Sequence, residues 1–286
     1  MPQPTADLTR LIRCACILEA TARKPGNVHP EAAFSDLCYD DFVKAARVAS
    51  PLLAESQQRG VGRAILDAVR ATGETTASNV NLGIILLLAP LASVPANLSL
   101  ADGISGVLDN LTQQDASLAY QAIRLASPGG MGRNETEDVS AEPTGTLLEV
   151  MRLAADRDAI AMQYASRFEL VLKTGVSILA AESDFRENWE QAIIRLQLTL
   201  MATCPDSLIA RKLGVDEARQ SAELAEAVLA AGWPSTRRAA QKLIELDVWL
   251  RDRENSRNPG TTADLVAASI FAALRDGLVE MPPGME

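Results

Sequence analysis

Apolar residues recur every three or four positions along most of the chain, which is the spacing expected of amphipathic helices. The first such stripe runs from Leu8 through Leu18 to Ala22 and predicts a helix over residues 8–23. The same spacing predicts further helices over residues 39–58, 62–72, 99–111, 113–126, 143–173 (with a break near Arg157), 175–182, 185–203, 216–231 and 236–254. No stretch of the sequence alternates apolar and polar residues as a strand does. The pattern therefore indicates an all-α protein.

Two segments are apolar on nearly every side, as expected of helices buried at the centre of a bundle. One contains residues 84–88 and predicts a helix over 79–94, and the other contains residues 265–274 and predicts a helix over 261–279. These helices come from opposite halves of a sequence that shows neither a repeat nor a linker. We therefore predict one domain over residues 1–286, a single multi-helix bundle with two buried central helices.

Composition and charge narrow the class of protein. The net charge of −10 argues against partners such as nucleic acid or an anionic membrane surface, which bind basic faces. The longest apolar run, residues 82–94, is too short to cross a bilayer and contains Pro90. The four cysteines lack metal-site spacing, and the first residues lack the apolar core of a signal peptide. We expect a soluble cytoplasmic protein with reduced cysteines.

The segment that follows the first predicted helix, KPGNVHP at residues 24–30, has the composition of a ligand-binding loop. Pro25 ends the helix, and Gly26 permits a turn and a close approach to the backbone. Lys24 adds a positive charge, Asn27 an amide and His29 the only imidazole in the chain. We predict that this loop binds a polyanion, although a lone histidine is more often structural.

Five carboxylates are candidate metal ligands. Glu19 and Asp247 fall within the apolar stripes of their helices, where an unpaired carboxylate is costly. Asp206 follows Pro205 and also fits an N-cap, and Asp36 precedes the helix over 39–58. Asp264 completes the set; with Thr261 it also fits a capping box. Solvated or capping roles remain the alternatives for all five.

Polar and glycine-bearing turns precede both buried helices, and a helix N-terminus is a natural site for phosphate. The first turn carries Ser78, Asn79, Asn81 and Gly83, of which one residue suffices as a cap. The second turn carries Asn258 and Gly260. Outside these turns, basic and glycine residues that can approach phosphates are Gly130, Arg133, Arg211 and Lys212, although a position facing water is the alternative for Arg211 and Lys212.

Taken together, KPG-x-V after a helix, the N-x-N-x-G helix entry, the Asp206 turn and NPG-T-T-ADL resemble the triphosphoribosyl-dephospho-CoA synthase family. The resemblance covers nearly the whole chain and implies an all-helical fold. It also implies transfer of the triphosphoribosyl group of ATP to dephospho-CoA, with release of adenine. The family motifs correspond here to Lys24, Gly26, Asn79, Gly83, Asp206, Asn258, Gly260 and Asp264.

The resemblance implies substitution at the anomeric carbon of the nucleotide ribose, with Mg²⁺ neutralising the triphosphate. Carboxylates near that carbon would stabilise its positive charge, as in glycoside hydrolysis. We predict catalytic roles for Glu19, His29, Asp206 and Asp264, with His29 as the base for the acceptor. We predict that nucleotide-binding residues include Lys24, Gly26, Asn27, Ser78, Asn79, Asn81, Gly83, Gly130, Arg133, Arg211, Asn258 and Gly260.

This chain departs from the family pattern at two places. His29 stands where the family has an aspartate, and residues 78–83 lack the family's histidine and lysine. The chain thus resembles a divergent archaeal and methylotroph branch of the family that is associated with pterin-type cofactor synthesis. Three functions remain open: transfer to dephospho-CoA or another acceptor, hydrolysis of an N-glycosidic bond, and nucleotide binding without catalysis. The expected partners are these small molecules and a second copy of the chain in a homodimer.

Overall fold

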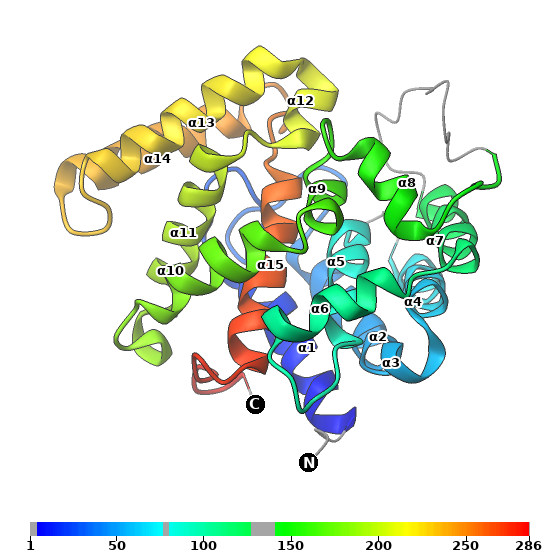
Figure 1. Ribbon diagram of the computed structural model, residues 1–286. Coiled ribbons are helices and arrows are strands. Elements are labelled where there is room, and N and C mark those ends of the chain that lie inside the picture. The colour runs from blue at the N-terminus through cyan, green and yellow to red at the C-terminus, as the bar shows by residue number, and fades with distance from the viewer. Residues whose placement is uncertain (1–4, 77–79, 127–140, 286) are drawn as a thin grey trace.

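The computed structural model describes residues 5–76, 80–126 and 141–285, and every regular element within these ranges is a helix (Figure 1). The helices are α1 Thr5–Thr21, α2 Tyr39–Ala54, α3 Ser56–Arg59, α4 Val61–Thr75, α5 Leu82–Ala92, α6 Leu100–Asp109, α7 Gln113–Ala126, α8 Leu147–Ala154, α9 Ala159–Ala165, the π-helix η1 Leu170–Gly175, α10 Val176–Ala180, α11 Phe185–Thr203, α12 Ser207–Leu213, α13 Val215–Ala230, α14 Arg237–Arg251 and α15 Gly260–Arg275. The predicted all-α fold is confirmed.

Helices α5 and α15 occupy the centre of the bundle, as predicted. Ten of the 11 residues of α5 are buried, and in α15 the side chains of Val266, Ile270 and Phe271 have no exposed surface. Both helices pack against α1, which lies beside them in Figure 1. Burying each large apolar side chain stabilises the fold by about 1.5–3 kcal/mol. The packing of the core therefore fixes the positions of the N-termini of α5 and α15.

Helices α11 to α14 pack around a second hydrophobic cluster, which includes Leu198, Met201 and Leu250. Arg257 fixes the turn between α14 and α15, because its guanidinium lies 4.0 Å from the centre of the Trp249 ring and donates to the Trp249 carbonyl oxygen at 2.9 Å. Helices α13 and α14 run side by side at the periphery of the molecule (Figure 1).

The segment predicted as a helix over 143–173 contains more interruptions than expected. The predicted break near Arg157 is confirmed: α8 ends at Ala154, and Asp158 caps α9 by accepting the N–H groups of Ile160 and Ala161 at 2.9 and 3.0 Å. A second break follows α9, where Phe168 adopts a φ of +61° and its side chain is fully buried. We attribute this unfavourable conformation to the burial of the ring, which helical periodicity alone does not reveal.

Other boundaries differ from the predicted ones by a few residues. The predicted helix over 39–58 is divided into α2 and α3 at Glu55. The helix predicted over 79–94 begins at Leu82, and the one over 261–279 ends at Arg275. Within the described ranges no helix combines the length and apolar character required to cross a membrane.

Candidate active site

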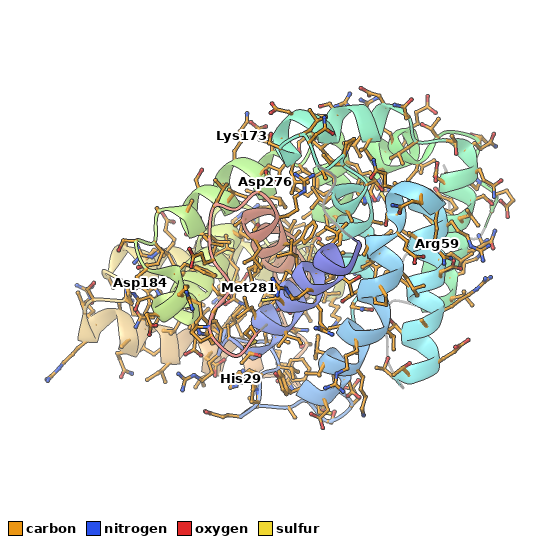
Figure 2. The ribbon with its side chains drawn as sticks, turned by 90° about the horizontal axis from the view of Figure 1, so that it is seen from below. His29, Arg59, Lys173, Asp184, Asp276 and Met281 are labelled. Carbon is orange, nitrogen blue, oxygen red and sulfur yellow. The ribbon has the colours of Figure 1, made fainter. Side chains whose placement is uncertain are left out.

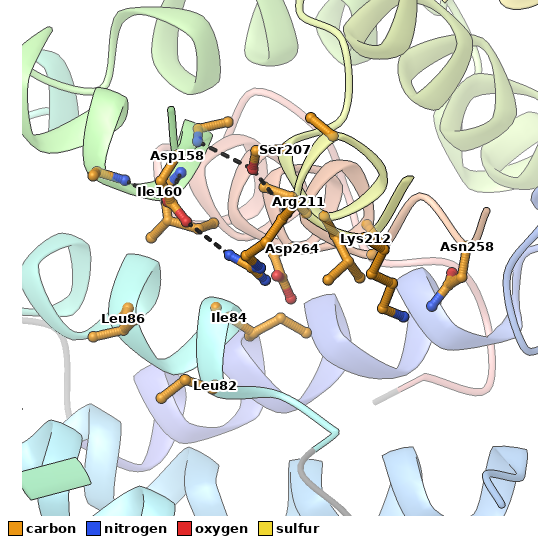
Figure 3. Close-up of a pocket in the computed structure, with 18 of the residues that line it drawn as sticks. Leu82, Ile84, Leu86, Asp158, Ile160, Ser207, Arg211, Lys212, Asn258 and Asp264 are labelled. Atoms are coloured by element: carbon orange, nitrogen blue, oxygen red, sulfur yellow. Dashed lines mark hydrogen bonds and ion pairs between the residues drawn. The ribbon is translucent and has the colours of Figure 1, made fainter. Parts of the chain in front are cut away.

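A cavity of about 1500 Å³ opens where the N-terminal ends of α5, α9, α12 and α15 approach the C-terminal half of α1 (Figure 3). Typical small-molecule sites occupy about 300–1,000 Å³, so this cavity has room for two sizeable substrates. Its apolar lining includes Leu86 of α5, Tyr120 of α7 and Val150 of α8, and its polar lining includes Glu19 and Asp264.

Glu19 and Lys24 form a buried ion pair at the base of the site. The Lys24 Nζ lies 2.9 Å from the Glu19 Oε1 and also donates to the Glu19 carbonyl oxygen. The side chain of Lys24 has no exposed surface, and that of Glu19 is 3% exposed. Lys24 therefore compensates a buried carboxylate. It does not line the cavity, so its predicted contact with a polyanion is not available in this arrangement.

The second oxygen of Glu19 is the unusual atom of this site. Glu19 lines the cavity, and its Oε2 is buried with no hydrogen-bond partner among the residues that the structure describes. Buried polar atoms are nearly always satisfied, so an orphaned carboxylate oxygen requires an explanation. A ligand or cation in the cavity that contacts this oxygen would provide one.

Asp264 brings a second carboxylate to the cavity from near the N-terminus of α15, just after its first turn. It accepts the N–H of Ile84 at the start of α5, and a Cβ at Gly83 would collide with the carboxylate. Burial, followed by the negative charges of Glu19 and Asp206, holds the pKa of Asp264 well above its usual value. Glycine at position 83 is thus required by the approach of Asp264.

The predicted capping box of Thr261 and Asp264 is wrong. Helix α15 begins at Gly260 after an N-cap at Pro259, which makes no side-chain cap hydrogen bond. A capping box assigns the acidic side chain to its own helix, whereas Asp264 caps a neighbouring helix that lies far away in sequence. Tertiary packing of α5 against α15 overrides the local signal.

Asp206 is a structural cap for two helices. Its Oδ1 accepts the N–H groups of Leu208 and Ile209 in α12, at 2.9 and 3.1 Å. Its Oδ2 accepts the N–H and hydroxyl of Thr262 in α15, at 2.7 and 2.8 Å. The N-cap prediction is confirmed. Because four donors satisfy both oxygens and the residue does not line the cavity, Asp206 acts here by joining α12 to α15.

An amide network fixes the loop that follows α1. Asn27 donates from Nδ2 to the Oδ1 of Asn258 at 2.8 Å, and its own Oδ1 accepts from Gln197 at 2.7 Å. Both asparagines line the cavity, as do Asn81 and Gly260. The predicted nucleotide-binding residues from three separate motifs therefore line the same cavity.

The remainder of the loop is occupied by contacts within the protein. Gly26 has a φ of +75°, donates to Asp247 at 2.8 Å, and leaves no room for a Cβ beside Leu250. Asp247 also accepts from Arg251 at 2.9 Å. Neither Gly26 nor Asp247 lines the cavity. The glycine is required for a close approach, as expected, but the approaching group is α14 and not a ligand.

His29 also lies outside the cavity lining. It is half-buried at the outer edge of the molecule in Figure 2, where its backbone pairs with Ala32. Burial and the positive charge of Arg251 lower the pKa of His29. This position gives the imidazole no direct access to the cavity, so we do not assign it the predicted role of base.

Cations line the cavity at its upper wall. Arg211 and Lys212 come from the last turn of α12, and Arg157 comes from the turn between α8 and α9. Arg211 donates to Asp158 at 3.4 Å. Lys212, which sequence analysis named with Arg211 as a residue able to reach phosphates, lines the cavity, whereas Asp158 was missed as a site residue. The predicted break near Arg157 adjoins Asp158, but nothing in the pattern placed Asp158 beside Arg211.

The predicted carboxylates do not all converge. Glu19, Asp264 and the exposed Asp36 line the cavity, whereas Asp206 and Asp247 are occupied elsewhere. In the described part of the chain, no three His, Cys, Asp or Glu side chains form a ready-made metal cluster. The predictions at Ser78, Asn79, Gly130 and Arg133 lie outside the described residues.

Comparisons with known proteins place this chain in a family. The family model for ATP:dephospho-CoA triphosphoribosyl transferase matches residues 5–282. A solved structure from Archaeoglobus fulgidus, assigned as a triphosphoribosyl-dephospho-CoA synthase, superimposes with a TM-score of 0.65 at 27% identity, covering 82% of this chain and 99% of that one. A search of curated proteins gave no match. The family resemblance inferred from the motifs is confirmed, and the chain belongs to the ATP:dephospho-CoA triphosphoribosyl transferase family.

Proposed function

We propose that this protein transfers the triphosphoribosyl group of ATP to the hydroxyl of an acceptor, with dephospho-CoA as the first candidate, and releases adenine. The observation that carries the proposal is the buried Oε2 of Glu19, which lies in the cavity wall and has no hydrogen-bond partner in the described part of the chain. A negative oxygen at that position suits a reaction whose transition state carries positive charge on the ribose. Membership of the transferase family supplies the donor and the acceptor.

The reaction requires one bond to form and one to break at the anomeric carbon. The acceptor oxygen bonds to this carbon while its bond to the adenine nitrogen breaks, and the electron pair of that bond leaves with adenine. The net proton transfer runs from the acceptor hydroxyl to adenine. Glu19 Oε2 would stabilise the ribose cation and accept the hydroxyl proton, while Lys24 holds the other oxygen of Glu19 in place.

The charge of the lining supports the predicted Mg²⁺. Six carboxylates and three cations line the described part of the cavity: Glu19, Asp36, Asp156, Asp158, Glu254 and Asp264 against Arg157, Arg211 and Lys212. A triphosphate would add further negative charge to this surface. The residues fit the ion, because Mg²⁺ in nucleotide sites usually takes one or two carboxylates together with substrate phosphates.

Asp264 is the carboxylate we assign to Mg²⁺, with Asp36 as the second candidate at the exposed rim. Burial raises the pKa of Asp264 most, and the negative charges of Glu19 and Asp206 raise it further; a divalent cation would offset these charges. When bound, the ion would neutralise the phosphates and orient them. Glu19 would remain available to the ribose.

Adenine release tests the proposal directly. The purified protein is incubated with ATP, Mg²⁺ and dephospho-CoA, and adenine is quantified by chromatography with and without the acceptor. We expect adenine only when the acceptor is present. Release without acceptor would identify an N-glycosidic hydrolase. ATP binding with no adenine under any acceptor would identify a binding protein and refute the enzymatic proposal.

A variant pair links the activity to the cavity. Glu19→Gln keeps an oxygen that can accept from Lys24 but removes the negative charge, so we expect adenine release to fall about 100- to 1,000-fold. Glu187→Gln, at an exposed position on α11, should retain full activity. Equal rates for the two variants would show that Glu19 does not act on the substrate.

A further inference from the structure

The cations of the cavity wall are concentrated on one short helix. Arg211 and Lys212 occupy the last turn of α12, and Figure 3 shows both side chains extending into the space in front of Asp264 and Asn258. Cations at the end of a helix often serve only to offset the helix dipole. The position of these two over a large cavity requires a more specific explanation.

Helix α12 is held rigidly, although its seven residues are too few to be stable alone. Asp206 ties its first turn to Thr262, and the Ser207 hydroxyl donates to Thr261 at 3.1 Å. The N–H of Ala159 donates to the Ser207 hydroxyl at 3.3 Å. The two cations are therefore presented to the cavity by a fixed support anchored to both α9 and α15.

Both cations retain hydrogen-bonding capacity. The ion pair of Arg211 with Asp158 is long, at 3.4 Å, and uses one of five guanidinium donors. Lys212 makes no ion pair with any described residue. Lys24, by contrast, is fully buried, lies outside the cavity lining and makes two contacts with Glu19. Positive groups that can meet an anion in the described lining are thus Arg211, Lys212 and the exposed Arg157.

We propose that Arg211 and Lys212 hold the polyphosphate chain of the nucleotide, with Arg157 at the edge of the same subsite. The guanidinium fork of Arg211 can bind two phosphate oxygens together, and Lys212 contributes a mobile point charge. The identification of the ligand as a nucleotide rests on the proposed function, whereas its class, a polyphosphate, rests on these side chains. In this proposal, Arg211 and Lys212 of α12 bind the phosphates, whereas the sequence had also predicted this role for Lys24.

Calorimetry with three probes tests the subsite: ATP with Mg²⁺, inorganic tripolyphosphate with Mg²⁺, and adenosine. In Arg211→Gln and Lys212→Gln we expect the affinities for ATP and tripolyphosphate to fall about 10- to 100-fold, as for loss of a charge-assisted hydrogen bond, with adenosine unaffected. Lys212→Arg should retain binding. The exposed Arg238→Gln on α14 is the matched control and should bind all three probes as the wild type does.

The outcomes separate this subsite from the proposed reaction. Unchanged tripolyphosphate binding in both variants overturns the subsite, even if the wild type releases adenine. Equal losses for adenosine and tripolyphosphate also overturn it, because they indicate general damage. Tripolyphosphate binding that depends on Arg211 and Lys212, in a protein that releases no adenine, supports the subsite and refutes only the reaction.

Discussion

The Glu19–Lys24 pair gives the strongest quantitative prediction, because both side chains are almost fully buried. Lys24→Met keeps most of the apolar stem and removes the ammonium, so little cavity is created and the main change is an uncompensated carboxylate. Removing one partner of a buried ion pair costs about 3–5 kcal/mol. We therefore expect Lys24→Met to lower the free energy of unfolding by about 3–5 kcal/mol, because the carboxylate of Glu19 would stay buried without a counter-charge.

Urea denaturation followed by circular dichroism measures this change, and a double variant provides the control. Glu19→Leu combined with Lys24→Met removes both charges and leaves no buried ion, so it should recover most of the lost stability. The coupling between the two sites then follows from the double-mutant cycle.

Two results would contradict the reasoning. If Lys24→Met unfolds at the wild-type urea concentration, the pair is not buried as described. If Lys24→Met keeps its stability but loses affinity for tripolyphosphate, Lys24 contacts phosphate after all, and its exclusion from the polyphosphate subsite would be wrong.

Three further variants test the cavity wall. Gly83→Ala should reduce adenine release about 100-fold by displacing Asp264, whereas Gly73→Ala, whose Cβ would meet no atom within 4 Å, should leave it intact; equal rates would refute the contact. Asp264→Asn should unfold at higher urea at pH 7 than the wild type, because ionising this high-pKa group opposes folding above about pH 4. That gain should vanish below pH 4 in a urea series across pH, and a gain independent of pH would exclude this cause. His29→Asn should release adenine within about twofold of the wild-type rate, since His29 lies outside the cavity, and a tenfold loss would restore its predicted role.

Sequence patterns recovered much of the fold because the helices here are strongly periodic. The predicted bounds of α7 and α11 agree with the structure, and the all-round apolar character of α5 and α15 identified the centre of the bundle. Glu19 was recognisable as a carboxylate on the buried face of a helix. Burying a carboxylate destabilises the fold unless another group compensates its charge. Helical periodicity and a carboxylate within an apolar stripe are local features, so the sequence reveals them without knowledge of the tertiary structure.

The partners of the site residues could not be predicted in the same way. Nothing in the sequence shows that the chain after α1 turns back so that Lys24 reaches Glu19, or that Leu250 packs on Gly26. The Thr261–Asp264 pattern satisfied a local rule that the approach of α5 overrode. Charge and motif thus indicated which residues matter, while the direction of each side chain depended on contacts between distant segments.

The packing of α1 against α15 also constrains the order of events during synthesis. Glu19 leaves the ribosome well before Asp264 and the helix that carries it, because the two residues lie far apart in the sequence. The cavity wall therefore forms only when α15 reaches α1 and α5. A nascent chain interrupted before residue 260 would expose the apolar surfaces that α15 covers, and it would lack the part of the cavity lining that Asp264 provides.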